Sequence, residues 1–347
     1  MHEALDALLG QRPVDVPMWA SFWDALGEDA LDRGEPIALL ASLTSNLADH
    51  ETVANLVRSL HMRRSGSTPS FPGVVNIVGT GGGPPTFNIS TAAALVAATL
   101  GVPIIKTGSR AYTSSCGSLD LLDRLGVNLT KTYDETGTML ERHGIAFAGY
   151  FVYPAELTTL ARRATPLPMR SFGRALNTLG PFLPVLPGTA QLTGVSSPAV
   201  LPLARHLAQA VDDRQVWLCS NDLGADELIG FTDNVIDAGD GVTQQRIGPD
   251  QLGPPAGTLA DLQPVTEPVR IVPHFLDVLS ARAGEAATET VALNAAALTI
   301  VAGRTSDWPA AISSARQAMQ SGAVVELLSR IRGERRAAPV FSTAVSL

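Results

Sequence analysis

A run of glycines between two apolar segments constrains the fold of this chain more than any other feature. Gly79-Thr80-Gly81-Gly82-Gly83 follows the short β-branched run at 74–78 and precedes the helical stretch AAALVAATLG, after which comes a second apolar run, VPIIKTG. The order strand, glycine-rich loop, helix, strand is expected of a parallel sheet with crossover helices. We therefore predict an α/β fold with a central, mostly parallel sheet.

The same alternation of patterns continues along the chain. Helices are predicted at 118–126, 134–144, 154–163, 197–211 and in the tail 286–331, and strands at 145–152, at 215–220 and in short runs within 231–249. Residues 1–64 carry apolar positions at helical spacing, and a linker rich in Ser, Pro and Gly follows. We predict a small N-terminal helical domain at 1–66, to which a helical segment near 165–188 is joined. The larger α/β domain then comprises 70–164 and 189–347.

Composition narrows the classes of function. The formal net charge of −8 over 347 residues argues against nucleic-acid binding, because that needs a basic face. No basic-then-apolar leader opens the chain, and its most apolar run, 92–105, is shorter than the about 20 residues that span a bilayer. Two distant cysteines, Cys116 and Cys219, indicate reduced thiols. We expect a cytoplasmic protein that binds neither nucleic acid nor membrane.

The segment from Gly79 to Thr91 carries groups suited to holding an anion. Glycines let backbone N–H groups approach closely, and Asn88, Ser90 and Thr91 stand where the next helix begins, at the positive end of its dipole. A plain tight turn with a capping Ser or Thr would explain a glycine cluster alone. The flanking strand and helix and the three polar donors favour a phosphate site. The spacing matches neither G-x-G-x-x-G nor a P-loop, which disfavours a dinucleotide fold or an ATPase.

Four short motifs occur in order over most of the chain. They are GTGGGPPTFNIST at 79–91, KTGSRAYTSSCGSLD at 106–120, NTLGP at 177–181 and GADE at 224–227. In that order they resemble GTGGD-x-x-x-T-x-N-x-S-T, KHGNR-x-x-S-S-x-x-G-S-x-D, N-x-L-G-P and the metal motif G-L-D-E of the anthranilate phosphoribosyltransferases. That family shares a structural superfamily with the pyrimidine nucleoside phosphorylases. The resemblance implies the superfamily's fold and a phosphoribosyltransferase activity.

The resemblance also implies how substrates are bound, since family members bind phosphoribosyl diphosphate (PRPP) with magnesium. The residues that match donor-binding positions are Gly79, Gly81, Gly82, Thr86, Asn88, Ser90, Thr91, Lys106, Ser114 and Ser118. Ser90, Asp226 and Glu227 match the positions that hold Mg²⁺, a hard ion suited to oxygen ligands; without the other motifs, the acidic pair would be assigned to a solvated turn. Positioning and electrostatics on the departing diphosphate would supply most of the acceleration. We assign no catalytic side chain.

The acceptor side departs from the family's pattern. Gly83 replaces the aspartate that closes the first motif, and Thr107 and Ser109 replace a histidine and an asparagine that lie near the acceptor. The arginine that helps bind the anthranilate carboxylate in the family has no equivalent before N-x-L-G-P, although Arg170 and Arg174 lie nearby. We therefore expect transfer to an aromatic amine or related nitrogen acceptor, anthranilate-like, at an altered site formed by Thr107, Ser109, Arg170 and Arg174.

Two further hypotheses stay open. A nucleoside phosphorylase would use free phosphate and a nucleoside; residues 117–120 also suit that branch, whereas TFNIST favours the transferase. A non-catalytic, ligand-binding homologue is kept open by the changes on the acceptor side. Trp19 and Trp23, four apart on a predicted helix, indicate a core or interface stripe. Because the family's N-terminal helices form its dimer interface, we expect an interface role for these tryptophans and a homodimer.

Overall fold

The N-terminal segment is helical, as predicted. The computed structural model describes residues 1–45, 49–64, 67–108, 116–238, 244–252 and 257–337, of which 334–337 by backbone only. The helical lobe consists of α1 (Glu3–Leu9), α2 (Val16–Gly27), α3 (Glu35–Ser45) and α4 (His50–Met62). Asp15 caps the start of α2: its Oδ1 accepts from the Met18 N–H group at 2.9 Å, as an N-cap residue does.

The two tryptophans of α2 lie inside the helical lobe. Trp19 and Trp23 are 0% and 1% exposed, and their indole N–H groups donate to the Thr52 carbonyl oxygen at 3.0 Å and to Ser59 Oγ at 2.8 Å. Both partners belong to α4, so the indoles hold α2 against α4 and satisfy their own polar atoms. The expectation that Trp19 and Trp23 form a subunit interface is therefore wrong.

A single sheet organises the rest of the chain and confirms the predicted α/β class. Its strands among the described residues are β1 (Val75–Gly79), β2 (Ile104–Lys106), β3 (Ile145–Phe147), β4 (Ala190–Gly194), β5 (Gln215–Asn221), β6 (Asn234–Asp237) and β7 (Gln244–Ile247). They lie in the order β3-β2-β1-β4-β5-β6-β7. The first five are parallel, and β6 and β7 add on antiparallel.

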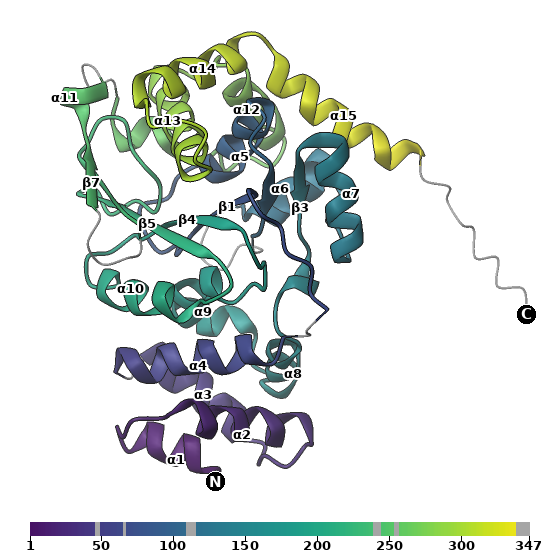
Figure 1. The fold of residues 1–347 in the computed structure, drawn as a ribbon, viewed down its shortest axis with the longest axis vertical. Coiled ribbons are helices and arrows are strands. Elements are labelled where there is room, and N and C mark those ends of the chain that lie inside the picture. Colours follow the sequence, from purple (N-terminus) through teal and green to yellow (C-terminus); the bar gives the residue numbers. More distant parts are fainter. Residues whose placement is uncertain (46–48, 65–66, 109–115, 239–243, 253–256, 338–347) are drawn as a thin grey trace, which may run out of the picture.

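Helices cover both faces of the sheet (Figure 1). The further helices are α5 (Ile89–Thr99), α6 (Ser118–Leu125), α7 (Tyr133–His143), α8 (Ala155–Arg163), α9 (Gly173–Leu179), α10 (Leu201–Ala210), α11 (Pro249–Leu252), α12 (Ile271–Leu279), α13 (Glu285–Val301), α14 (Trp308–Gln320) and α15 (Ala323–Ala337). Helices α5, α12, α13 and α14 lie above the sheet in this view, and α10 and α9 lie between the sheet and the helical lobe. No helix in the described ranges is both long and apolar enough to cross a membrane.

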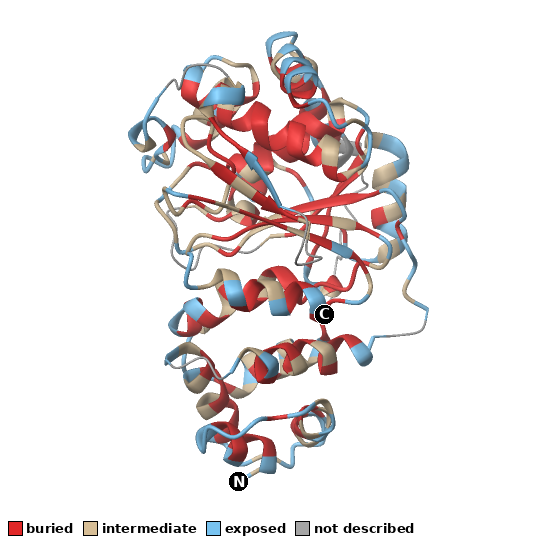
Figure 2. Cartoon of the chain, turned by 60° about the vertical axis from the view of Figure 1, so that its left-hand side comes forward, coloured by how far each residue is buried: buried red, intermediate tan, exposed pale blue. Residues whose placement is uncertain are grey.

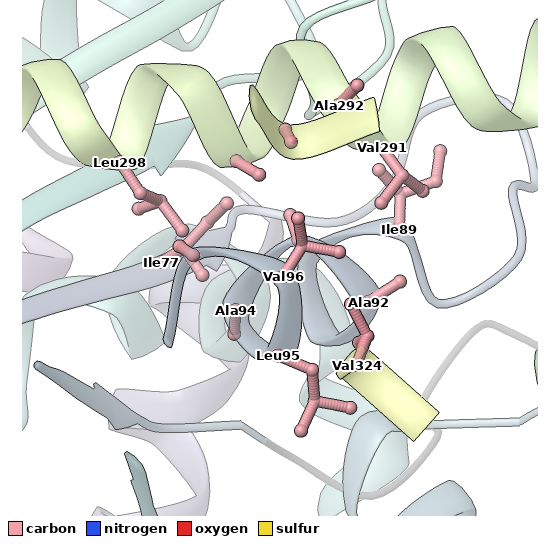
Figure 3. Close-up of a cluster of buried hydrophobic side chains, with 14 of the residues drawn as sticks. Ile77, Ile89, Ala92, Ala94, Leu95, Val96, Val291, Ala292, Leu298 and Val324 are labelled. Carbon is pink, nitrogen blue, oxygen red and sulfur yellow. The ribbon is translucent and has the colours of Figure 1, made fainter. Parts of the chain in front are cut away.

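Helix α5 is enclosed on almost every side. Its residues Ile89 and Thr91–Ala98 are all buried, and Figure 3 shows Ile89, Leu95 and Val96 among side chains of β1, α13 and α15. A helix that is apolar all round belongs in the interior of a large domain. Close packing of this kind leaves little freedom, so the first turn of α5 has a fixed position relative to β1.

The predicted strand at 145–152 is only partly correct. Strand β3 ends at Phe147, and Tyr150–Val152 forms a 3₁₀ turn. The chain leaves the sheet at Gly149, where a Cβ atom would lie 2.7 Å from the Thr130 carbonyl oxygen.

Strand β4, by contrast, was not predicted, although it pairs with β1 and β5 at the middle of the sheet. Its sequence AQLTG lacks an apolar run, since the buried side chains of Gln191 and Thr193 are polar. They are joined to each other by a hydrogen bond of 2.9 Å.

Two large apolar clusters stabilise the fold. One surrounds α5 and α13. The other contains the buried residues of α1–α4 and continues through α9 and α10 to Leu218 on the sheet, and Figure 2 shows buried residues along these helices and the strands. The boundaries 1–66, 165–188, 70–164 and 189–347 stay a prediction, since the second cluster crosses them without a break.

Candidate functional site

The candidate site lies where β1 and β4 end. Gly79 and Gly194 are paired opposite each other at the last position of these parallel strands. From β1 the strand order continues to β2 on one side, and from β4 it continues to β5 on the other. Open α/β sheets bind ligands in the crevice outside the carboxyl ends of their strands at such a switch point. Lys106 ends β2 and Asn221 ends β5 at the same edge.

Close backbone approach accounts for the glycines of the loop. Gly81 and Gly82 have φ angles of 60° and 80°, values that favour glycine. A Cβ atom would lie 2.0 Å from Asp226 Oδ2 at Gly79, and 1.6 Å from the Asp226 carbonyl oxygen at Gly194. The Gly81 N–H group donates to Asp226 Oδ2 at 2.8 Å. The glycine loop and Asp226, which lie 145 residues apart, therefore form one packed unit.

Two buried asparagines hold the acidic segment 226–227 from both sides. Asn221 donates to the Glu227 carbonyl oxygen at 2.7 Å and makes three more hydrogen bonds to the backbone of the same turn. Asn294 of α13 donates to the carbonyl oxygen of Leu228 at 2.7 Å and accepts from its N–H group at 3.1 Å. Satisfied buried amides of this kind specify one backbone arrangement, so they fix the backbone that carries both carboxylates.

Asp226 and Glu227 are half-buried and follow each other in the chain. Burial raises the pKa of Asp226, whereas the hydrogen bond from the Gly81 N–H group and the charge of Lys106 lower it in part. Burial and the neighbouring Asp226 charge raise the pKa of Glu227 well above its ordinary value. The Thr86 hydroxyl lies 3.4 and 3.5 Å from the two carboxylate oxygens of Glu227. Two neighbouring carboxyl groups disfavour each other's ionisation, and a bound cation would offset this repulsion.

Lys106 supplies a buried positive charge at the same edge of the sheet. It is 4% exposed, and its Nζ donates to the Thr107 carbonyl oxygen at 2.8 Å. Burial lowers the pKa of Lys106 to about 8, although the Glu227 and Asp226 charges oppose this change. A desolvated ammonium group close to a glycine loop suits an anionic ligand.

The first turn of α5 contributes further polar groups. Asn88 Nδ2 donates to the Cys116 carbonyl oxygen at 3.2 Å, which links the first motif to the second. Ser90 is half-buried. Thr91 is fully buried, and its hydroxyl has no hydrogen-bond partner within the described ranges. Because α5 is enclosed (Figure 3), these groups have a fixed position beside the glycine loop.

The two ends of the second motif also meet. Ser118 opens α6, and a Cβ atom at Gly108 would lie 2.1 Å from Ser118 Oγ. Ser118 is therefore in contact with the backbone that follows Lys106. The predicted donor residue Ser114 and the predicted acceptor residue Ser109 lie outside the described residues.

The remaining predicted acceptor residues occupy two different environments. Thr107 is 1% exposed, and its hydroxyl and N–H group are hydrogen-bonded to Asn76, so the structure places it inside the sheet rather than in an open pocket. Arg170 and Arg174 are exposed, and no ion pair with either is present in the described part of the chain. The nearby Asn177 does reach the loop, since its Nδ2 lies 3.1 Å from where a Gly81 Cβ would be.

Three residues of the site were not identified from the sequence: Asn221, Asn294 and Ser196. The Ser196 hydroxyl, two residues beyond β4, donates to the Gly81 carbonyl oxygen at 2.6 Å, and the Ser196 N–H group donates to Thr80 Oγ1 at 3.2 Å. Asn221 carries a local signal, because an asparagine before a glycine-containing turn commonly bonds to the backbone of that turn. Nothing near Asn294 or Ser196 in the sequence marks them, since their partners are distant along the chain.

The chain is similar in sequence to a family of known enzymes. Residues 72–325 match the model of a glycosyl transferase family, a/b domain. The anthranilate phosphoribosyltransferase of Geobacillus thermodenitrificans is 33% identical over 310 residues, which cover 88% of this chain and 90% of the relative. That of Bacillus licheniformis is 30% identical over 336 residues, 96% of this chain and 98% of the relative.

Two solved structures are similar to this chain in fold. The anthranilate phosphoribosyltransferase of Thermus thermophilus superposes with a TM-score of 0.80 at 26% identity, over 97% of this chain and all of that one. The enzyme of Saccharomyces cerevisiae in complex with PRPP and Mg has a TM-score of 0.74 at 21% identity, over 93% of each chain.

Proposed function

This chain belongs to the anthranilate phosphoribosyltransferase family of glycosyltransferases, and we propose that it transfers a phosphoribosyl group from PRPP to an aromatic amine or related nitrogen acceptor. The observation that carries the proposal is the contact between the glycine loop and the acidic segment, at Gly81 and Asp226. It brings the backbone that we propose to bind the anion next to a carboxylate that we propose to bind the metal.

The donor's diphosphate is proposed to lie between the glycine loop and the first turn of α5. Backbone N–H groups of the loop and the free N–H groups at the start of α5 would donate to its oxygens. The half-buried Ser90 hydroxyl is available there, and the buried Thr91 hydroxyl beside it has no hydrogen-bond partner among the described residues. Lys106 adds a positive charge from β2. This charge attracts an anion more strongly in a buried site than in water, which suits the binding of a highly charged donor.

Asp226 and Glu227 fit a magnesium ion. Their carboxylates have raised pKa values, and one oxygen of Asp226 is left after the bond from Gly81. The described residues hold no group of three or more His, Cys, Asp or Glu side chains that could bind a metal alone. This agrees with an ion that keeps water ligands and shares substrate phosphates, as Mg²⁺ does. When bound, Mg²⁺ would offset negative charge on the diphosphate.

The proposed reaction breaks the bond between C1 of the ribose and the diphosphate oxygen. A bond from the acceptor nitrogen to C1 forms, the diphosphate leaves with the electron pair of the broken bond, and the nitrogen releases a proton to solvent. The residues of this chain are proposed to bind, orient and stabilise charge. Lys106 and the loop N–H groups act on the departing diphosphate, so no covalent intermediate with a side chain is needed.

The acceptor is proposed to be anthranilate-like but not bound as in the rest of the family. Thr107 is buried in the sheet, and no arginine stands at the matched position before N-x-L-G-P. Arg170 and Arg174 are exposed on the segment that leads to Asn177, which touches the glycine loop. We propose that one of them binds the acceptor's negative group.

The test is turnover with PRPP and Mg²⁺ in the presence of anthranilate and of a panel of other aromatic amines, with diphosphate release as the readout. We expect release that depends on an amine, and weaker use of anthranilate in Arg170→Ala or Arg174→Ala. Phosphate-dependent base release from nucleosides, without use of PRPP, would refute the proposal in favour of a phosphorylase. Binding of PRPP with no turnover on any amine would favour a non-catalytic homologue.

We also propose a cytoplasmic homodimer that assembles through the N-terminal helices. Leu9 of α1 and Met62 of α4 are 50% and 73% exposed, which leaves apolar surface on the helical lobe although its tryptophans are buried. Light scattering after size exclusion should give twice the chain mass of 36.3 kDa. A monomer at micromolar concentration would contradict this.

A further inference from the structure

Gln191 of β4 is a buried side chain that makes four hydrogen bonds. It is 0% exposed. Its Oε1 accepts from Asn76 Nδ2 and from Arg214 Nε, both at 3.1 Å. Its Nε2 donates to the Pro181 carbonyl oxygen at 2.8 Å and to Thr193 Oγ1 at 2.9 Å. All donors and acceptors of the amide are thus in use, in a place where an unmade bond would be costly.

One branch of this network leads to the end of β2. Asn76 Nδ2 also donates to Thr107 Oγ1 at 2.9 Å, and Asn76 Oδ1 accepts from the Thr107 N–H group at 3.1 Å. The Thr107 carbonyl oxygen in turn accepts from Lys106 Nζ at 2.8 Å. Gln191 therefore holds the asparagine that fixes Thr107, and through it the carbonyl group that orients the Lys106 ammonium.

The other branch leads to the segment 177–181, NTLGP. The Pro181 carbonyl oxygen accepts from Gln191 and, at 3.4 Å, from Arg214. Arg214 is pinned in turn by its 2.7 Å bond to Asp213 and its 2.8 Å bond to the Pro184 carbonyl oxygen. At the opposite end of the same segment, Asn177 lies against Gly81. The segment is therefore fixed at Pro181 while its first residue contacts the glycine loop.

We propose that Gln191 is a positioning residue that ties Lys106, at the end of β2, to the segment 177–181 across β1 and β4. The proposal rests on the proposed function, because that function assigns Lys106 to the departing diphosphate and the segment that leads to Asn177 to the acceptor. Gln191 is linked to the first through Asn76 and bonded directly to the second, whereas the contact of the glycine loop with Asp226 does not involve it. Its loss should weaken both donor binding and acceptor use and leave that contact in place.

The experiment compares Gln191→Met, which keeps the size and removes every hydrogen bond, with Gln191→Glu, which keeps Oε1 for Asn76 and Arg214. Thr136→Val is the matched control, because it removes a fully buried hydroxyl, bonded to Thr130 at 2.8 Å, from α7. We expect Gln191→Met to raise the KM for anthranilate at least tenfold and the Kd for PRPP with Mg²⁺ at least threefold. Gln191→Glu should recover part of the loss, and Thr136→Val should change neither constant.

Hydrogen exchange of the full chain gives a second readout that needs no acceptor. Gln191→Met should speed exchange at the amides of Thr107 and Leu186, whose partners are the Asn76 and Asp213 side chains, and leave the Gly81 amide unchanged. Equal acceleration at all three amides, or at none, would overturn the proposal, as would a KM for anthranilate and a Kd for PRPP that both stay unchanged in Gln191→Met. If the wild type binds no PRPP, the proposed function fails, and the exchange pattern still decides the role of Gln191.

Discussion

Replacement of Lys106 by methionine should make the protein more stable and less able to bind its donor. Burial moves the pKa of Lys106 from its usual 10.5 to about 8. This change corresponds to a cost of about 3 kcal/mol for carrying the charge in the folded chain. The hydrogen bond from Nζ to the Thr107 carbonyl oxygen contributes about 1 kcal/mol in the opposite direction. We therefore expect Lys106→Met to raise the free energy of unfolding by about 2 kcal/mol at pH 7.

The effect has a defined pH dependence. Because the folded-state pKa lies below the unfolded-state value, the folded chain holds fewer protons than the unfolded chain between pH 8 and 10.5. The stability of the wild type should rise across that window, and the full cost of the charge should be present below pH 8. The advantage of Lys106→Met over the wild type should accordingly shrink as the pH rises from 8 toward 10.5.

Urea unfolding at several pH values measures this difference, and calorimetry measures the affinity for PRPP with Mg²⁺. The control is Lys131→Met, since Lys131 is the chain's other lysine and is exposed. With two lysines in the chain, isotope labelling of lysine would also report the Lys106 pKa directly by NMR. The reasoning is refuted if Lys106→Met is less stable than the wild type at pH 7, or if its donor affinity is unchanged.

Three further changes test the construction of the site. Gly83→Asp restores the family's residue, but a Cβ atom there would lie 2.4 Å from the Gly224 carbonyl oxygen. The variant should therefore lower the free energy of unfolding by about 1–3 kcal/mol and should not improve turnover. Improved turnover would contradict this. Asn221→Ala should lower stability by about 3 kcal/mol and weaken Mg²⁺-dependent PRPP binding at least tenfold in calorimetry, because the acidic turn loses four hydrogen bonds. A thiol reagent should modify half-buried Cys116 before Cys219 in the native protein. Burial raises the pKa of both thiols, but only Cys219 is fully enclosed. Cys116→Ser should remove the early reaction.

Local sequence patterns were sufficient to predict the strand, loop and helix around Gly79 and the order of most elements. They work there because β1 and α5 are mostly apolar and the glycines are required by the close backbone approach of the loop. Asp226 and Glu227 were identified by the resemblance of residues 224–227 to a metal motif. The structure places Asp226 against the glycine loop. The roles predicted for individual residues of the site remain predictions.

Features that depend on distant partners could not be read from the sequence. β4 was missed because its buried Gln191 and Thr193 are polar; Thr193 is bonded to Gln191, whose other partners lie on β1 or outside the sheet. Asn294 is separated by 66 residues from Leu228, which it holds. Trp19 and Trp23 had the spacing of a surface stripe, but partners on α4 place them in the core. Pattern alone does not distinguish these cases, because both kinds of stripe are apolar at helical spacing.

The central claim is that the glycine loop and the acidic segment together bind a magnesium-complexed diphosphate. Calorimetric titration of the wild type and of Asp226→Asn with PRPP, each with and without Mg²⁺, tests it most directly, since asparagine can still accept from the Gly81 N–H group. The account predicts that Mg²⁺ strengthens PRPP binding to the wild type at least tenfold and has little effect on Asp226→Asn. Equal PRPP affinity in all four titrations would contradict it.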